Sequence, residues 1–158
     1  MGDFRIWKGE HRTFYIKKIG MKKKLKNVLL IDDSESDNFY HQRKIKNMGI
    51  TDNIHISYSG AEALEYLRSE LDGVHPQPTL IFLDINMPGM NGWEFLEEYE
   101  KLLLAQQGEV VLTMLSNSID PRDEEKATQY KAVQGYYSKP LSEEYLTSIL
   151  EKHFPDYL

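Results

Sequence analysis

Short apolar runs alternate with amphipathic segments along most of this chain. Two runs are continuously apolar and end on acids: residues 28–31 before Asp32 and Asp33, and residues 80–83 before Asp84. Runs of this length, bounded by turn residues, predict strands that are buried on both faces of a sheet. Three more stretches predict strands, namely residues 54–58, 109–115 and 135–138. In residues 54–58, apolar residues alternate with polar ones, which predicts a strand with one face more exposed to water.

The segments between these strands carry apolar residues at helical spacing, and each predicts a helix. The predicted helices cover residues 36–48, 61–67, 92–105, 123–133 and 142–153. We expect Ser36 or Asp37 to be the N-cap of the first helix and Gly49 to mark its end. Two prolines and a glycine in residues 72–79 predict a loop.

This regular alternation predicts an α/β fold, with a parallel sheet covered by helices on both faces. Right-handed crossovers make a doubly wound sheet of five strands the expected arrangement. Such sheets bind their ligands beyond the carboxyl ends of the strands. The acids that end the two apolar runs should therefore lie at the functional edge.

Composition narrows the class of protein. The chain has 158 residues, 41% of them apolar, which suits one globular domain with a real core. Cysteine is absent, which excludes disulfides and thiolate metal sites. No apolar run approaches the roughly 18 residues of a membrane span, and no secretory signal is present. We expect a cytoplasmic protein without membrane association.

The charge is unevenly distributed. Residues 1–26 hold nine Lys and Arg against two acids, whereas the rest holds ten against twenty-three, so the net charges are +7 and −13. Met21 followed by a lysine-rich stretch looks like a natural start. We therefore expect residues 1–26 to be a basic extension, either a non-native start or disordered, and residues 27–158 to be the folded domain. A nucleic-acid role for the extension is disfavoured, because phosphates would repel the acidic body.

The three acids at the strand ends should converge. Two unit charges about 4 Å apart repel by roughly 4 kcal/mol at an effective dielectric constant near 20. Asp32, Asp33 and Asp84 therefore need a proton, a cation or a basic side chain nearby. A site made only of oxygen ligands favours Mg²⁺. The alternative is that these acids are helix caps or turn residues.

Two other strand ends carry groups that suit a phosphoryl site. Ser116 follows the fourth strand and offers a hydroxyl, and Lys139 follows the fifth strand, directly before Pro140. A lysine ammonium is well suited to contact a phosphate oxygen. Either residue alone would be an ordinary surface side chain, but the four strand ends together form a specific set.

At this point the chain resembles the receiver domain of two-component response regulators, over about residues 27–153. The resemblance rests on motifs in a fixed order, namely Asp32-Asp33, the segment 83–92, Leu115-Ser116, Gly135-Tyr136 and Lys139-Pro140. It implies a flavodoxin-like strand order of 2-1-3-4-5.

The resemblance also implies a role for each site residue. Asp84 would be the phosphoacceptor, which attacks a phosphohistidine of a sensor histidine kinase. Mg²⁺ would be held by Asp33, Asp84 and the main-chain carbonyl of Asn86, with Asp32 acting through a water. Lys139 and Ser116 would contact the phosphoryl oxygens, and Ser116 and Tyr136 would form the conformational switch.

Some positions depart from the common pattern of the family. Asn117 stands where a small residue is usual, and Asn86 and Ser118 occupy positions that tune the lifetime of the phosphoryl group. Asn86 also argues against the main alternative, a haloacid dehalogenase-type hydrolase, because such enzymes need a second Asp at this position. Another alternative is a degenerate receiver that only scaffolds.

The resemblance implies protein partners. We expect a sensor histidine kinase or a histidine phosphotransfer protein as phosphodonor, and a downstream protein as target. Because the chain ends just after the last helix, we expect a single-domain regulator without an output domain, rather than an enzyme. The surface formed by the last strand and the last two helices is the expected docking face, where a homodimer could also form.

Overall fold

The computed structural model contains a five-stranded parallel sheet. It describes residues 4–9, 12–17, 20–107 and 111–158. The strand order is β4-β3-β5-β6-β7, and the strands are β3 Val28–Ile31, β4 Ile54–Ser57, β5 Leu80–Asp84, β6 Val111–Ser116 and β7 Val133–Ser138. Counted from β3, this order is 2-1-3-4-5, so the predicted doubly wound α/β fold is confirmed.

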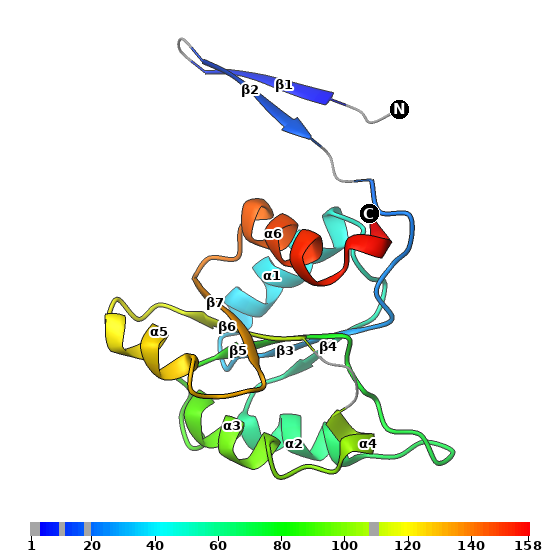
Figure 1. Cartoon of the computed structure of the whole chain (residues 1–158), viewed down its shortest axis with the longest axis vertical. Helices are drawn as coiled ribbons and strands as arrows, with labels where there is room; N and C mark the ends of the chain where they lie inside the picture. Colours follow the sequence, from blue (N-terminus) through cyan, green and yellow to red (C-terminus); the bar gives the residue numbers. More distant parts are fainter. Residues whose placement is uncertain (1–3, 10–11, 18–19, 108–110) are drawn as a thin grey trace.

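Helices cover both faces of this sheet (Figure 1). On one face lie α1 Glu35–Asn47 and α6 Glu143–His153, and on the other α2 Gly60–Arg68, α3 Gly92–Tyr99 and the short α4 Leu104–Gln107. Each face has its own apolar core. Ile45, Phe82 and Leu146 lie in one cluster, and Leu83 and Phe95 in the other.

The register of the sheet brings the chemistry-bearing strand ends together. Ile31 pairs with Leu83, so the residues that follow, Asp32 and Asp84, lie side by side. Ser116 pairs with Ser138, the residue before Lys139. The two central strands are fully buried along their length, as the continuous apolar runs predict.

The boundaries of two helices differ from the predictions. The N-cap of α1 is Ser34, whose hydroxyl accepts from the main-chain N–H of Asp37, so the expected N-cap at Ser36 or Asp37 was wrong. Helix α5 runs from Pro121 to Ala127, earlier and shorter than predicted, because Asp120 caps it and Pro121 starts it.

The helix predicted over residues 92–105 is broken. It ends at Tyr99, and the side-chain amide of Gln107 donates to the carbonyls of Tyr99 and Leu102. These bonds satisfy carbonyls that a continuous helix would have paired internally. Leu103, expected on the packed face, is 67% exposed as a result.

The amino-terminal residues include two described strands, β1 Phe4–Gly9 and β2 Arg12–Lys17, which pair antiparallel. Residues just before β3 contact the domain directly. Leu25 is buried, and its N–H donates to the carbonyl of Ile50. The N–H of Lys22 donates to Tyr157, which lies in the 3₁₀ turn η1 Pro155–Tyr157 near the carboxyl terminus. The packed body therefore begins a few residues before Val28. Whether residues 1–20 have a role stays a prediction.

Among the residues that the structure describes, no helix is long and apolar enough to cross a membrane.

Candidate functional site

Three carboxylates meet at the carboxyl end of the sheet. Asp32, Asp33 and Asp84 each place an oxygen so that these atoms lie within 4.8 Å of one another. Asp32 and Asp84 are 4% and 6% exposed, whereas Asp33 is open to solvent. This is the convergence that the two apolar runs predict, and the group has one accessible side.

Lys139 reaches into this acidic group from the end of β7. Its ammonium Nζ lies 2.5 Å from an oxygen of Asp32, 2.9 Å from Asp37 and 3.5 Å from Asp84. The lysine side chain is only 6% exposed. The buried acids are therefore partly neutralised by one internal cation, and the chain places both predicted partners of a phosphoryl group, Asp84 and Lys139, in contact.

The main chain fixes where Lys139 lies. Its N–H donates to the carbonyl of Ser116 over 2.9 Å, which ties β7 to the end of β6. The peptide bond between Lys139 and Pro140 is cis. After it, the N–H of Leu141 faces Nε2 of His41, 3.4 Å away on α1.

The electrostatics single out Asp84. Burial, with a contribution from the nearby Asp32, raises the pKa of its carboxyl to about 6, although Lys139 opposes both effects. A hydrogen bond from Lys139 lowers the pKa of Asp37. Burial alone would lower the pKa of Lys139, but its hydrogen bonds to Asp32 and Asp37, together with the charges of Asp32 and Asp84, outweigh burial and raise it. The site thus holds an ionised lysine beside a partly desolvated carboxyl, Asp84, whose ionised form is disfavoured.

The acid group also fits a hard divalent cation. Its donors are carboxylate oxygens from three side chains, and one of them, Asp33, is open to solvent. Mg²⁺ is commonly held by one or two carboxylates while it keeps several waters. Burial first, and the charge of Asp32 second, raise the pKa of Asp84, and a bound cation would favour its ionised form. The main-chain carbonyl of Asn86 as a further ligand stays a prediction.

A close approach of two backbone segments holds Asp84 in place. The N–H of Gly92 donates to the carbonyl of Ile85 over 2.8 Å, folding the loop after β5 back on the strand. A Cβ atom at Gly92 would lie 2.6 Å from the carbonyl oxygen of Asp84, which is why glycine is needed there. Asn91 then starts α3 with a reciprocal capping box to Glu94.

The predicted switch residues are neighbours on β6 and β7. Ser116 is fully buried, and its hydroxyl accepts from the N–H of Ser118 over 2.9 Å. The hydroxyl of Tyr136 is buried and has no hydrogen bond of ordinary geometry to the described residues. Burial raises the pKa of Tyr136, and nearby Ser116 and Ser118 oppose that rise. The aromatic hydroxyl therefore lies close to the two serines without being held by them.

The positions that depart from the family pattern lie around this site. Asn117 and Asn86 are exposed. Ser118 donates a hydrogen bond to Asp123 at the start of α5. None of these three residues displaces Asp84, Lys139 or Ser116 from the strand ends.

Sequence reasoning missed the contribution of α1. Asn38 donates to the main-chain carbonyl of Asp32 over 2.7 Å, and Asp37 binds Lys139. A signal was present, because Asp37 belongs to the first turn of the helix that follows Asp32 and Asp33 and therefore starts at the same edge of the sheet. Its partner, however, is 102 residues away in the chain, and no local pattern identifies it.

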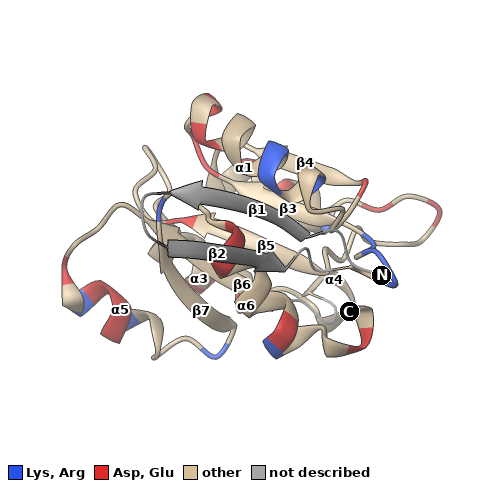
Figure 2. Cartoon of the chain, turned by 90° about the horizontal axis from the view of Figure 1, so that it is seen from above, with Lys and Arg blue, Asp and Glu red and all other residues tan. Residues whose placement is uncertain are grey.

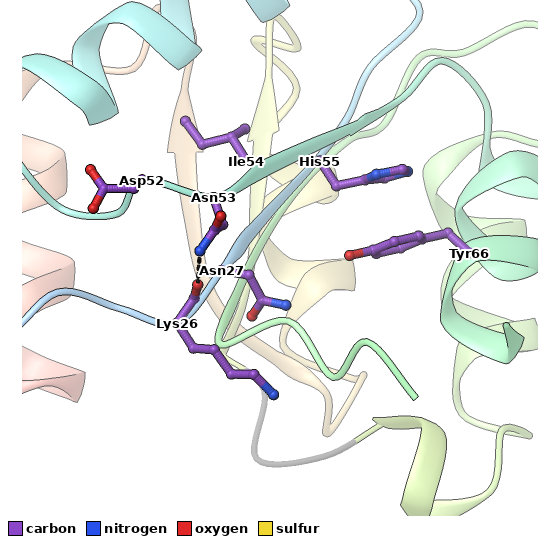
Figure 3. A pocket seen from close by; sticks show the side chains of 7 residues that line it. All are labelled: Lys26, Asn27, Asp52, Asn53, Ile54, His55 and Tyr66. Atoms are coloured by element: carbon purple, nitrogen blue, oxygen red, sulfur yellow. Dashed lines mark hydrogen bonds between the residues drawn. The ribbon is translucent and has the colours of Figure 1, made fainter. Parts of the chain in front are cut away.

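A hollow of about 400 Å³ lies at the opposite, amino-terminal edge of the sheet (Figure 3). Its residues come from the starts of β3 and β4 and from α2, and they are Lys26, Asn27, Asp52, Asn53, Ile54, His55 and Tyr66. The rings of His55 and Tyr66 stack 3.6 Å apart. The amide of Asn53 is bonded to the carbonyl of Lys26, and Asn27 donates to Pro76. This hollow therefore lies away from Asp84 and its amides are occupied by the fold.

Known proteins share this arrangement. The sequence model described as the response regulator receiver domain matches residues 28–151. In the crystal structure of a two component response regulator from Cytophaga hutchinsonii, the matched chain is 35% identical, with a TM-score of 0.75 over 82% of this chain and 97% of that chain.

Two curated relatives agree. "Probable methanogenesis regulatory protein FilR2" of Methanothrix harundinacea is 28% identical over 125 residues, which is 79% of each chain. "Sensor histidine kinase CheAY" of Helicobacter pylori is 30% identical over 125 residues, which is 79% of this chain but 14% of that much longer protein. With the sheet order, the strand-end acids and the family match in agreement, the chain belongs to the response regulator receiver domain family.

Proposed function

We propose that this protein accepts a phosphoryl group on Asp84 from a phosphohistidine of a sensor histidine kinase or a histidine phosphotransfer protein. The observation that carries the proposal is the contact between a buried, desolvated carboxylate and a buried lysine at the carboxyl end of the sheet. Asp84 and Lys139 are 3.5 Å apart, and two more acids lie beside them.

The transfer is a simple displacement. A carboxylate oxygen of Asp84 attacks the phosphorus, the new O–P bond forms, and the N–P bond of the donor breaks. The electron pair of that bond stays on the imidazole nitrogen, which then takes up a proton. Little covalent assistance is needed, so the task of the protein is to position the groups and to neutralise charge.

Residues of this chain supply that neutralisation. Lys139 is already ionised beside Asp84 and would contact an oxygen of the arriving phosphoryl group. Ser116, at the end of β6, would offer its hydroxyl to another oxygen. Asp33, Asp84 and the carbonyl of Asn86 would hold Mg²⁺, with Asp32 acting through a water. When bound, the ion would offset the negative charge that gathers on the transferring group.

The switch would use Ser116 and Tyr136. Movement of the Ser116 hydroxyl toward the phosphoryl group would break its bond to the Ser118 N–H and open space beside Tyr136. The buried Tyr136 hydroxyl has no bond of ordinary geometry to give up among the described residues. A bias of a few kcal/mol between the two states would suffice to change which surface a partner meets.

The proposed readout is a protein–protein contact. A downstream protein would dock on the surface formed by β7, α5 and α6, where a homodimer could also form. Acidic residues lie on several helices around the sheet, α5 included (Figure 2). Residues 27–158 carry a net charge of −13, which disfavours direct nucleic-acid binding.

Intact-mass measurement after incubation with acetyl phosphate and Mg²⁺ tests the proposal. We expect one phosphoryl group on the wild-type protein, none on Asp84→Asn, and little labelling when Mg²⁺ is chelated. Asp52→Asn is a matched control, because it removes an exposed acid at the opposite edge of the sheet, paired with Lys24, and should label normally. Equal labelling of Asp84→Asn and wild type would refute the assignment, and labelling without Mg²⁺ would refute the metal role of Asp33.

A further inference from the structure

A carboxylate outside the cluster of Asp32, Asp33 and Asp84 also pairs with Lys139. Asp37, in the first turn of α1, places an oxygen 2.9 Å from Nζ, closer than the 3.5 Å that separates Nζ from Asp84. Asp37 is outside the group of acids that could share a metal ion. The proposed phosphoacceptor is therefore the most distant of the three carboxylates around the ammonium.

The backbone leaves Lys139 little freedom except in its side chain. Its N–H is bonded to Ser116, and Leu141, two residues later, faces His41 on α1. His41 follows Asp37 by four residues, so both lie on one face of the helix. The same face of α1 thus contacts both the lysine ammonium and the segment that follows it.

Asp37 is itself firmly placed. Its main-chain N–H donates to the capping hydroxyl of Ser34 over 3.2 Å. Its side chain is 36% exposed, against 6% for Asp32. The partly hydrated carboxylate stays ionised readily, in keeping with its lowered pKa. A cation shared by Asp32, Asp33 and Asp84 would weaken their attraction for the lysine but would leave that of Asp37 intact.

We propose that Asp37 is a positioning residue that holds the Lys139 ammonium on the α1 side of the site and opposes its contact with a phosphoryl group on Asp84. The inference rests on the proposed phosphoacceptor role of Asp84. An arriving phosphoryl group must draw Lys139 away from Asp37 or share it, and Asp37 adds a negative charge close to the incoming anion. Asp37 therefore sets how readily the site accepts and keeps the group.

Removing this charge should strengthen binding of a phosphoryl group. In Asp37→Asn the ammonium keeps its partner Asp32 but loses its other close carboxylate. For a partly exposed ion pair we expect a two- to fivefold gain, on the order of what such pairs contribute. The dissociation constant of beryllofluoride, a stable mimic of the phosphoryl group, should fall by this factor, as should the concentration of acetyl phosphate that gives half-maximal labelling.

The test measures beryllofluoride binding by calorimetry at fixed Mg²⁺ and acetyl phosphate labelling by intact mass, in wild type and three variants. Glu35→Gln is the matched control, because Glu35 is an exposed acid in the same helical turn that, among the described residues, forms no ion pair with Lys139. Asp37→Glu keeps the charge. We expect tighter binding only in Asp37→Asn, and near wild-type binding in the other two.

Two results would overturn the inference. Either Asp37→Asn binds beryllofluoride no more tightly than Glu35→Gln does, or it binds more weakly, as a purely structural role in α1 would require. Urea denaturation of each variant separates the two effects, because lower stability alone does not tighten binding. Failure of the proposed function looks different: wild type itself would neither label nor bind beryllofluoride, and the role of Asp37 would fall with it.

Discussion

Replacing Asp84 by Asn should stabilise the protein when no divalent cation is present. Asp84 lies beside Asp32 at a buried edge of the sheet, and among the residues that the structure describes Lys139 is the one cation paired with both. Asn has nearly the same shape as Asp but carries no charge. The substitution leaves Lys139 paired with Asp32 and Asp37, so it removes the uncompensated charge without leaving the lysine unpaired.

The raised pKa of Asp84 gives the magnitude. It lies at about 6, against an ordinary value of 3.8. Each unit is worth 1.36 kcal/mol, so the ionised side chain destabilises the folded state by about 3 kcal/mol. Because the folded protein holds this proton more tightly than the unfolded chain does, stability falls as the pH rises between about 4 and 6. Below that window the folded and unfolded states are both protonated and the penalty disappears.

Urea denaturation at a series of pH values, in buffers with a chelator, measures this effect. At pH 7.5 we expect Asp84→Asn to be more stable than wild type by about 2–4 kcal/mol, and at pH 4 by less than about 0.5 kcal/mol. Mg²⁺ should narrow the gap at pH 7.5, because an ion that binds only the folded wild type stabilises it.

Two outcomes would refute this reasoning. If Asp84→Asn were less stable than wild type at pH 7.5, the ionised Asp84 would stabilise the folded state through Lys139 rather than destabilise it. If the difference were the same at pH 4 and pH 7.5, its origin would be packing rather than ionisation.

Three further substitutions test the elements that build the site, each by urea denaturation. Lys139→Met should destabilise the folded protein by about 3–5 kcal/mol, because it leaves buried acids unpaired. Its control, Lys24→Met, removes an exposed pair with Asp52 and should change stability by less than about 1 kcal/mol. Equal effects of the two substitutions would contradict the buried role of Lys139. Gly92→Ala should destabilise the folded protein by about 1–3 kcal/mol, because its Cβ would lie 2.6 Å from the Asp84 carbonyl oxygen. Its control, Gly20→Ala, should be neutral, because a Cβ atom there would meet nothing within 4 Å. Asn91→Ala should lower stability by about 1 kcal/mol through loss of the α3 capping box, and an unchanged midpoint would contradict that role.

The sequence predicts the sheet well because its signal is local. Continuous apolar runs specify β3 and β5, and a doubly wound parallel sheet then has to place their final acids side by side. The sequence alone, without any knowledge of side-chain contacts, therefore predicts which side chains lie at this edge of the sheet, namely those of Asp32, Asp33, Asp84, Ser116 and Lys139. Their chemical roles come from the family resemblance and stay predictions.

What the sequence does not predict depends on contacts made after folding. The break between α3 and α4 depends on the side chain of Gln107, which folds back on Tyr99 and Leu102. Apolar periodicity continues through that break and conceals it. Asp37 was expected only as a cap, because its ion pair with Lys139 forms across the packed interface between α1 and the end of β7.

The central claim is that Asp84 carries the phosphoryl group, and chemical trapping tests it most directly. Borohydride reduces an aspartyl phosphate to homoserine, which tandem mass spectrometry locates in a peptide. After labelling with acetyl phosphate and Mg²⁺, we predict homoserine at position 84 and at no other acid of the cluster. Homoserine at Asp32 or Asp33, or a stable adduct on Ser116 in place of it, would contradict the account.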